Sequence, residues 1–233
     1  MIQFGSASSR LINFIINEVL PPFIRDSFLM KPLFYFAFGG RAKKFIDFRD
    51  QYEALTPEAI ASIYQETAAC DLKKDSDISG QLIDRILAVV SPGQSLLDVG
   101  CGRGRLIDSL SSKCSVYGVD LAPAAPAGMR GRYLMARVES LPFRSDVYDV
   151  VVCAHVLEHV PDIFTAIAEL RRVATKRLII VLPVERPYRF GFNLHLWFFR
   201  YRLNVLQVLM PKAGSVWSLD KLRNEWIYIE ELD

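Results

Sequence analysis

Between residues 76 and 185, short apolar segments alternate with segments in which apolar side chains recur every three or four positions. The short segments predict strands at 96–99, 116–119, 133–138, 149–154 and 178–182. The helical spacing predicts helices over 83–90, 106–110 and 163–170. Strands that alternate with helices through short connections indicate the α/β class. We therefore expect a Rossmann-like, doubly wound and mostly parallel sheet.

The parts of the chain that flank this alternation have a different pattern. Residues 1–75 are helical and aromatic in character, with breaks at proline and glycine pairs. Within them Thr56 is placed to cap a helix, because a threonine oxygen can accept from the first free amides. Residues 193–210 are one long apolar segment, which predicts a single helix.

The C-terminal part is short. Residues 225–232 are a good candidate for a last strand, and 215–219 are a weaker one. The pattern divides the chain into an N-terminal helical cap, residues 1–75, and a second domain, residues 76–233. This domain has an aromatic insertion at about 186–222.

One segment, Asp98-Val99-Gly100-Cys101-Gly102-Arg103-Gly104, follows a predicted strand and opens a predicted helix. Glycines at such a place allow a sharp turn and let a ligand approach the main chain closely. Asp120 ends the next strand, at the spacing where an acidic side chain meets ribose hydroxyls. Open α/β sheets bind ligands at this C-terminal edge, so the pattern predicts an adenosine site.

The spacing of the glycines distinguishes between adenosine ligands. Dinucleotide folds use G-x-G-x-x-G and hold a pyrophosphate at the helix N-terminus, whereas this chain has G-x-G-x-G. Asp98, just before the glycines, would repel a pyrophosphate and would suit a ligand with an ammonium and a sulfonium group. A nicotinamide oxidoreductase is therefore disfavoured.

Composition excludes other classes of function. The formal charge of +2 is too small for an electrostatic nucleic-acid binder, so no nucleic acid is expected as a partner. The four cysteines form no CxxC pair and have no histidine at metal-ligand spacing, so no metal site is expected. Free thiols in apolar segments indicate a reducing, cytoplasmic compartment.

The N-terminal segment has too few consecutive apolar residues to span a bilayer. Residues 11–20 include two asparagines and a glutamate, and no basic region precedes them as in a signal peptide. The longer segment 11–38 combines apolar stretches with Arg10, Arg25 and Lys31. This combination favours peripheral contact with the inner face of a membrane.

Four segments in order resemble the motifs of class I S-adenosylmethionine-dependent methyltransferases, in particular the type 11 group. They are LLDVGCGRGRLI, VYGVDLAP, ESLPFRSDVYDVVVCAHVLEHV and RLIIVLP, and the resemblance covers about residues 76–185. More loosely, LPPFIRDS and NEWIYIEEL resemble methyltransferases of polysaccharide assembly. The resemblance implies S-adenosylmethionine as co-substrate and S-adenosylhomocysteine as product.

The resemblance also implies which residues bind this donor. These residues lie in the glycine loop and just before it, at the ends of the second and fourth strands, and in the segment before LPF. They are Asp98, Gly100, Cys101, Gly102, Gly104, Asp120, Leu121, Val138, Glu139, Ala154 and His155. Asp120 would bind the ribose hydroxyls and Leu121 would pack on adenine. Many relatives have Asp where this chain has Arg137, so Glu139 or the Val138 backbone is expected to make the adenine contact.

Methyl transfer to a hydroxyl also needs a base with a pKa near neutrality. The candidate catalytic residues are His155, Glu158 and His159, which follow the fourth strand. The alternative interpretation is that Glu158 and His159 hold the turn before Pro161 by hydrogen bonds. Aromatic residues within 34–38 and 190–201 either pack the flanking parts on the sheet or line an acceptor channel.

The sequence favours a methyltransferase that acts on a small-molecule, glycan-precursor or lipid-linked acceptor, by O-methylation. The alternative is a non-catalytic protein of the same fold that binds the donor or serves as a scaffold. Donor titration separates the two. The sequence leaves open the acceptor, the methylated atom and the oligomeric state.

Overall fold

The computed structural model describes residues 19–32, 47–56, 59–60, 62–63, 78–121, 132–189 and 194–232. The chain divides into two compact units, and each is treated by itself. The small unit comprises residues 1–70 and 186–196, and the large unit comprises residues 71–185 and 197–233. The small unit thus includes the first part of the predicted insertion, and the predicted boundary at residue 75 stays a prediction.

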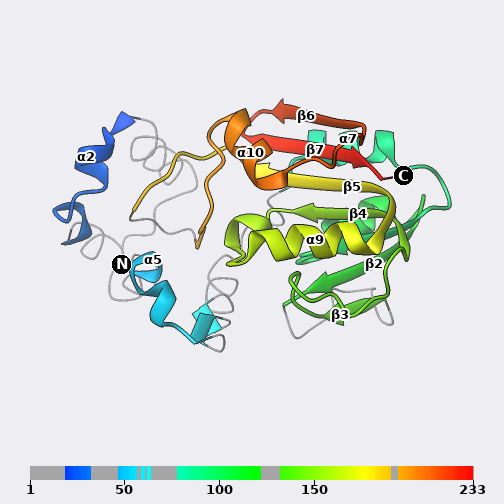
Figure 1. The fold of residues 1–233 in the computed structure, drawn as a ribbon, viewed down its shortest axis with the longest axis horizontal. Coiled ribbons are helices and arrows are strands. Elements are labelled where there is room, and N and C mark those ends of the chain that lie inside the picture. The colour runs from blue at the N-terminus through cyan, green and yellow to red at the C-terminus, as the bar shows by residue number, and fades with distance from the viewer. Residues whose placement is uncertain are drawn as a thin grey trace. The chain divides into compact units, whose positions relative to one another are not determined.

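A seven-stranded sheet forms the large unit (Figure 1). Its strands are β1 (Ser95–Val99), β2 (Ser115–Asp120), β3 (Tyr133–Met135), β4 (Tyr148–Ala154), β5 (Ala174–Pro183), β6 (Trp217–Leu222) and β7 (Glu225–Glu231). The order is β3-β2-β1-β4-β5-β7-β6, with β1 to β5 parallel and β7 antiparallel to both of its neighbours. This confirms the predicted Rossmann-like sheet. The weaker candidate for a strand is also present, as β6.

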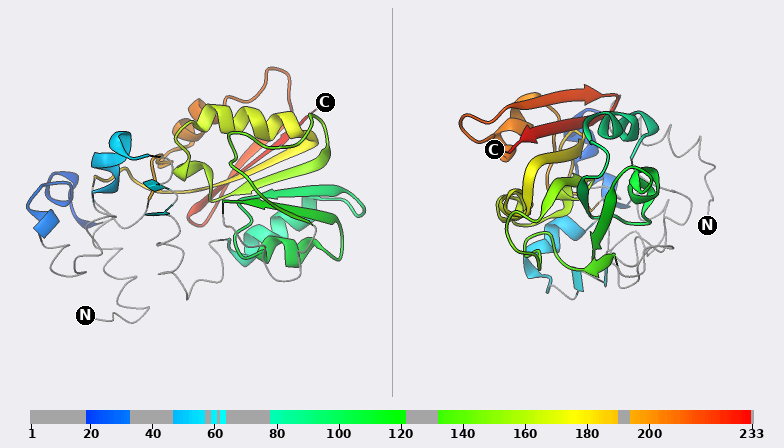
Figure 2. Two further views of the ribbon diagram at one scale, coloured as in Figure 1. Left: turned by 90° about the horizontal axis from the view of Figure 1, so that it is seen from below. Right: turned by 90° about the vertical axis from the view of Figure 1, so that its right-hand side faces the viewer.

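Helices cover both faces of this sheet, with α7 and α8 on one side and α9 on the other (Figure 2). Their bounds are α7 (Gly80–Val89), α8 (Arg105–Leu110), α9 (Ile163–Val173) and α10 (Arg202–Leu209). Neighbouring strand residues alternate between the two layers. Leu96 packs with the α7 and α8 side, and Leu97 packs with the α9 and α10 side. Both are fully buried, so Leu97→Ala would cost about 2–5 kcal/mol.

Polar side chains cap the starts of several helices. Ser79 accepts from the Leu82 amide at the start of α7, and Asp162 accepts from the Thr165 amide at the start of α9. Thr56 accepts a hydrogen bond of 3.3 Å from the Ala59 amide, which confirms its predicted role as a cap.

The prediction of one helix over 193–210 is wrong for its first half. Residues 194–200 are not helical, and α10 begins only at Arg202. The Trp197 amide donates to the Glu158 carbonyl, and the Trp226 indole donates to the Phe199 carbonyl. These tertiary hydrogen bonds replace helical ones, so an apolar run that is compatible with a helix folds as an extended segment.

The small unit contains the short helices α2 (Pro22–Arg25) and α5 (Phe48–Gln51), and η2 (Tyr52–Ala54) follows α5. Arginines of α2 and α5 contact the loop that includes Pro187 and Tyr188. Arg25 is buried, pairs with Asp26 and donates to the Pro187 carbonyl. The Arg49 guanidinium stacks 4.4 Å from the centre of the Tyr188 ring. Among the described residues, no helix has the length and apolarity needed to cross a bilayer. The aromatic residues within 34–38 lie outside the described residues.

Candidate functional site

After β1 the chain enters a loop of three glycines that turns back on the end of β2. Gly100, Gly102 and Gly104 have φ angles of 77°, 50° and 82°, in the left-handed region that favours glycine. The amides of Gly100 and Cys101 both donate to the Val119 carbonyl, at 2.7 and 3.1 Å. These bonds fix the loop at the C-terminal edge of the parallel strands, where the sequence predicts the ligand site.

Two of these glycines have different surroundings. A β-carbon on Gly100 would lie 2.0 Å from Cγ2 of Val156, so the close approach of Val156 leaves no room for a side chain. A β-carbon on Gly102 would meet no atom within 4 Å. Gly100 is therefore required by the packing of the protein itself, whereas the main chain at Gly102 stays open to a ligand.

The carboxylate of Asp120 lies at the tip of this loop. Its Oδ2 accepts a hydrogen bond of 2.8 Å from the Gly102 amide, across 18 residues of sequence. A carboxylate oxygen has two lone pairs, so Asp120 keeps acceptor capacity for the hydroxyls of a ligand. The structure thus brings together the glycine loop and the acidic residue that the sequence predicted as one site.

The second carboxylate of the site, Asp98, is buried on β1. Its Oδ2 has no hydrogen-bond partner among the described residues. Burial, with a smaller contribution from the charge of Asp120, raises the pKa of Asp98 to about 7. An unpartnered buried carboxylate is costly, and a cationic group beside it would remove that cost.

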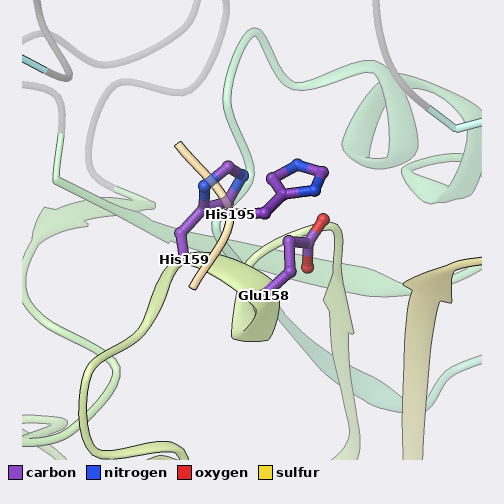
Figure 3. Close-up of side chains that lie close together, drawn as sticks. All are labelled: Glu158, His159 and His195. Atoms are coloured by element: carbon purple, nitrogen blue, oxygen red, sulfur yellow. The ribbon is translucent and has the colours of Figure 1, made fainter. Parts of the chain in front are cut away.

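The three candidate catalytic residues follow β4 directly. His155 is partly buried, with a side chain 14% exposed, and adopts a left-handed backbone with φ of 55°. Glu158 and His159 lie on the short helix η3 (Leu157–His159), from which both side chains extend in Figure 3. Glu158 is buried, whereas His159 is partly exposed. His195, also drawn there, belongs to the small unit.

The imidazole of His155 lies between two buried carboxylates. Its Nε2 is 3.0 Å from Oε1 of Glu225, and its Nδ1 is 3.4 Å from Oε1 of Glu158. The other oxygen of Glu225 accepts from the Ser79 hydroxyl at 2.7 Å. Burial by itself lowers the pKa of His155, but the hydrogen bonds and charges of the two glutamates outweigh it and raise the pKa to about 10.

The family described as "Methyltransferase domain" matches residues 97–182. A ubiquinone biosynthesis O-methyltransferase of Hahella chejuensis is 38% identical over 94 residues, 36% of this chain and 40% of that protein. Its counterpart in Marinobacter nauticus is 35% identical over 127 residues, 48% and 53% of the two chains. The chain thus spans about half or less of the length of these curated relatives.

Solved structures match a larger part of the chain. A SAM-dependent methyltransferase from Aquifex aeolicus covers 65% of this chain and 89% of its own, at 18% identity and a TM-score of 0.53. Magnesium protoporphyrin IX methyltransferase from Synechocystis, with bound SAM, covers 75% and 97%, at 19% identity and the same TM-score. At this level of identity they show the fold.

Residues 97–182 thus match a methyltransferase domain, within a sheet that has the fold of class I S-adenosylmethionine-dependent methyltransferases.

The residues of this methyltransferase domain fit the donor of the family. The unpartnered oxygen of Asp98 suits the positive charge of the methionine part, and Asp120 is placed to accept from ribose hydroxyls. Leu121 has a side chain that is 49% exposed, so it is available to an adenine ring. The roles of these residues in binding the donor stay predictions.

Arg137, where this chain departs from the expected motif, contacts a carboxylate two residues away. Arg137 forms an ion pair of 2.7 Å with Glu139, whose side chain is 16% exposed against 49% for Arg137. Glu139 thus places a carboxylate beside Arg137, in the segment where the sequence predicts the adenine contact. The contact of Glu139 and the buried Val138 with adenine stays a prediction.

Sequence reasoning missed Glu225 and Ser79. Both contact each other across 146 residues of sequence, and Glu225 contacts His155 across 70. The only local signals are an acidic residue that opens an apolar strand and a serine placed to cap a helix. Neither signal points to the end of β4, because only the antiparallel pairing of β7 with β5 brings Glu225 there.

Proposed function

We propose that this protein transfers the methyl group of S-adenosylmethionine to an oxygen of a small-molecule, glycan-precursor or lipid-linked acceptor. The observation that carries the proposal is the glycine loop between two carboxylates, with Asp120 bound to Gly102 and Asp98 buried with one oxygen unpartnered. Such a site suits a cationic sulfur nucleoside better than a pyrophosphate, because the pyrophosphate is repelled by both carboxylates.

We propose oxygen as the methylated atom because the matching curated relatives are named O-methyltransferases. They include the ubiquinone biosynthesis enzymes and a malonyl-[acyl-carrier protein] O-methyltransferase of Halorhodospira halophila, 31% identical over 56% of this chain. The acceptors in these names are those of the relatives and are not assigned to this chain. For this chain the acceptor class rests on its own aromatic flanking segments and on the exposed apolar residues described below.

The chain's own contribution would consist mainly of binding and orientation. The donor supplies an already activated methyl group, so the protein has to fix both partners and exclude water. Asp120 would hold the ribose, and Asp98 would neutralise the positive charge of the methionine part. Ala154, buried at the end of β4, would border the methionine.

A hydroxyl acceptor would also need a proton acceptor. His155 is poorly suited, because both of its ring nitrogens face carboxylates and its raised pKa keeps it protonated at neutral pH. Glu158 is buried and shares the same contact. We therefore propose His159, which is partly exposed on η3, as the base.

Two measurements on the full chain test the proposed activity. Calorimetric titration should show binding of both S-adenosylmethionine and S-adenosylhomocysteine. Incubation of extracts with methyl-labelled donor should move label into a small or lipid-extractable product, and Asp120→Ala should slow this transfer when the donor is below saturation. Binding without transfer to any acceptor would favour a non-catalytic donor-binding protein. Absence of binding by either nucleoside would contradict the donor site itself.

We also propose peripheral contact of the N-terminal part with an anionic membrane, at the inner face of which the enzyme would meet a lipid-linked acceptor. The support is a group of exposed large apolar side chains: Val19, Phe23, Ile24, Phe28 and Leu29. Residues 1–44 hold six Arg and Lys against two acidic residues, a formal charge of +4. Apolar side chains within a basic segment are typical of interfacial binding.

Sedimentation with vesicles tests this contact. The full chain should sediment with phosphatidylglycerol-containing vesicles and less with phosphatidylcholine alone, and the double variant Phe23→Ser, Leu29→Ser should stay in the supernatant. Phe164→Ser, at another exposed phenylalanine on α9, is the matched control and should sediment like the wild type. Equal sedimentation of the double variant and the wild type would contradict the proposal.

A further inference from the structure

The cluster of His155, Glu158, Glu225 and Ser79 lies at the edge of the sheet where the donor site was placed. His155 directly follows β4, and Glu225 begins β7 opposite Pro183, the last residue of β5. Ser79 caps α7, and Glu158 lies on η3. One histidine therefore connects elements that are distant in sequence but meet at the C-terminal ends of β4 and β5.

The contacts of His155, a hydrogen bond to Glu225 and an ion pair of 3.4 Å with Glu158, favour a charged ring. A neutral imidazole has one N–H and one acceptor nitrogen, whereas each ring nitrogen here faces a carboxylate oxygen, which only accepts. Only the imidazolium donates in both directions. Replacement of a buried ion pair by apolar groups of similar volume is often neutral or stabilising, so stability alone is a weak explanation of the cluster.

The residue next to His155 forms one wall of the glycine loop. Val156 approaches Gly100 so closely that no β-carbon fits between them. The His155 amide also donates to the Val181 carbonyl at 3.1 Å, so backbone and side chain fix the same turn. Any movement of the turn after β4 would therefore displace the loop that the donor would contact.

We propose that His155 is a positioning residue, which holds the turn after β4 against the glycine loop through its hydrogen bonds to Glu158 and Glu225. This inference rests on the proposed donor site. It assigns to His155 a role in donor affinity, and it assigns no proton transfer to it. Glu225 and Ser79 act through His155 and belong to the same positioning network.

The charge of His155 is testable without any donor. On the wild-type protein, ¹⁵N spectra of the histidine side chains should show His155 as an imidazolium at pH 7.5, above the usual range for histidine. The facing titratable groups are Glu158 on η3 and Glu225 on β7, with the Ser79 hydroxyl behind Glu225. A neutral His155 at this pH would overturn the proposal even if the donor binds.

The variants separate positioning from catalysis and from stability. His155→Ala should weaken donor binding roughly tenfold to a hundredfold. The KM for the donor should rise accordingly, while kcat at saturating donor and the shape of the pH–rate profile stay near wild type. His155→Lys, which restores a cation between the glutamates, should recover part of the affinity, and His155→Gln should not.

Glu230→Ala is the matched control for a merely structural effect. Glu230 is buried at the other end of β7 and pairs with Arg171. This variant should lower the melting temperature and leave donor affinity unchanged.

Wild-type affinity in His155→Ala would overturn the proposal, and so would a fall in kcat of about 10²–10⁴-fold at unchanged KM, which marks a base. Failure of the wild type to bind any donor would instead refute the proposed function.

Discussion

The amide of Gly102 and the carboxylate of Asp120 are joined by a hydrogen bond of 2.8 Å. The bond connects the tip of the glycine loop to the end of the neighbouring strand, and it uses only part of the acceptor capacity of the carboxylate. Asp120 therefore fixes the loop, and under the proposed function it would also accept hydrogen bonds from the hydroxyls of a ribose.

Asp120→Ala is expected to weaken donor binding by about 1–3 kcal/mol, because charge-assisted hydrogen bonds are lost and the Gly102 amide loses its acceptor. Calorimetric titration with S-adenosylhomocysteine measures the change. Asp120→Asn keeps an oxygen acceptor of the same size and should have the smaller effect. Affinity equal to the wild type in both variants would remove Asp120 from the site.

Gly102→Ala should lower donor affinity more than it lowers stability. A β-carbon there meets no protein atom, so its contact would be with the donor, added to a backbone strain of about 1–2 kcal/mol at positive φ. Gly93→Ala is the matched control, because Gly93 has φ of 81° and equally open surroundings, in a turn between α7 and β1. It should show the same loss of thermal stability with unchanged binding. Equal affinities in the two variants would mean that the loop does not approach the donor.

Asp98 should make the free protein less stable as pH rises between about 4 and 7. Burial, and then the charge of Asp120, raise its pKa from 3.8 to about 7 in the folded state. Within that window the folded state binds more protons than the unfolded state, so the free energy of unfolding falls as pH rises. Denaturant titrations at pH 5 and 7 should show a smaller fall for Asp98→Asn. A slope equal to that of the wild type would contradict the assignment.

The carboxyl group of Asp98 should also couple donor binding to the release of a proton. If the donor's positive charge requires the ionised form, affinity should rise by up to about tenfold per pH unit between pH 5 and 7. Calorimetry at pH 6 in buffers of different ionisation enthalpy should detect release of protons on binding. In Asp98→Asn this release should disappear, and its persistence would show that another group titrates.

Glu230→Ala should destabilise the large unit strongly. The carboxylate is fully buried, accepts from Arg171 Nε at 2.8 Å, and also accepts from the Lys212 amide and the Ser215 hydroxyl. Breaking such a buried pair costs about 3–5 kcal/mol, because the remaining partners lose their acceptor. Chemical denaturation measures it. Lys176→Ala, which breaks an exposed pair with Asp149, is the control and should cost less than about 1 kcal/mol.

Local periodicity was enough to predict the sheet. Strands such as β4 are apolar over most of their length because helices cover both faces of the sheet, and this pattern is visible in the sequence of the strand itself. The glycine loop and Asp120 were also predictable, since each follows a strand end and parallel strands end at the same edge. Their contact, Gly102 to Asp120, agrees with that expectation.

The course of residues 194–200 was not predictable in the same way. Their apolar spacing is compatible with a helix, but hydrogen bonds from Trp197 and to Phe199 link them to residues elsewhere in the large unit. Propensity within a short segment carries no information on such partners, so tertiary contacts decided the outcome.

The sequence by itself determined the fold and the glycine loop, because both depend on residues close together in the chain and on the regular geometry of parallel strands. Only the tertiary structure decided the protonation state of the His155 ring. Its two carboxylates come from η3 and from β7, the latter 70 residues away, and their combined charge in a buried setting keeps the ring protonated. A pKa is set by what surrounds a group in space, and that surrounding exists only once the antiparallel strand has joined the sheet.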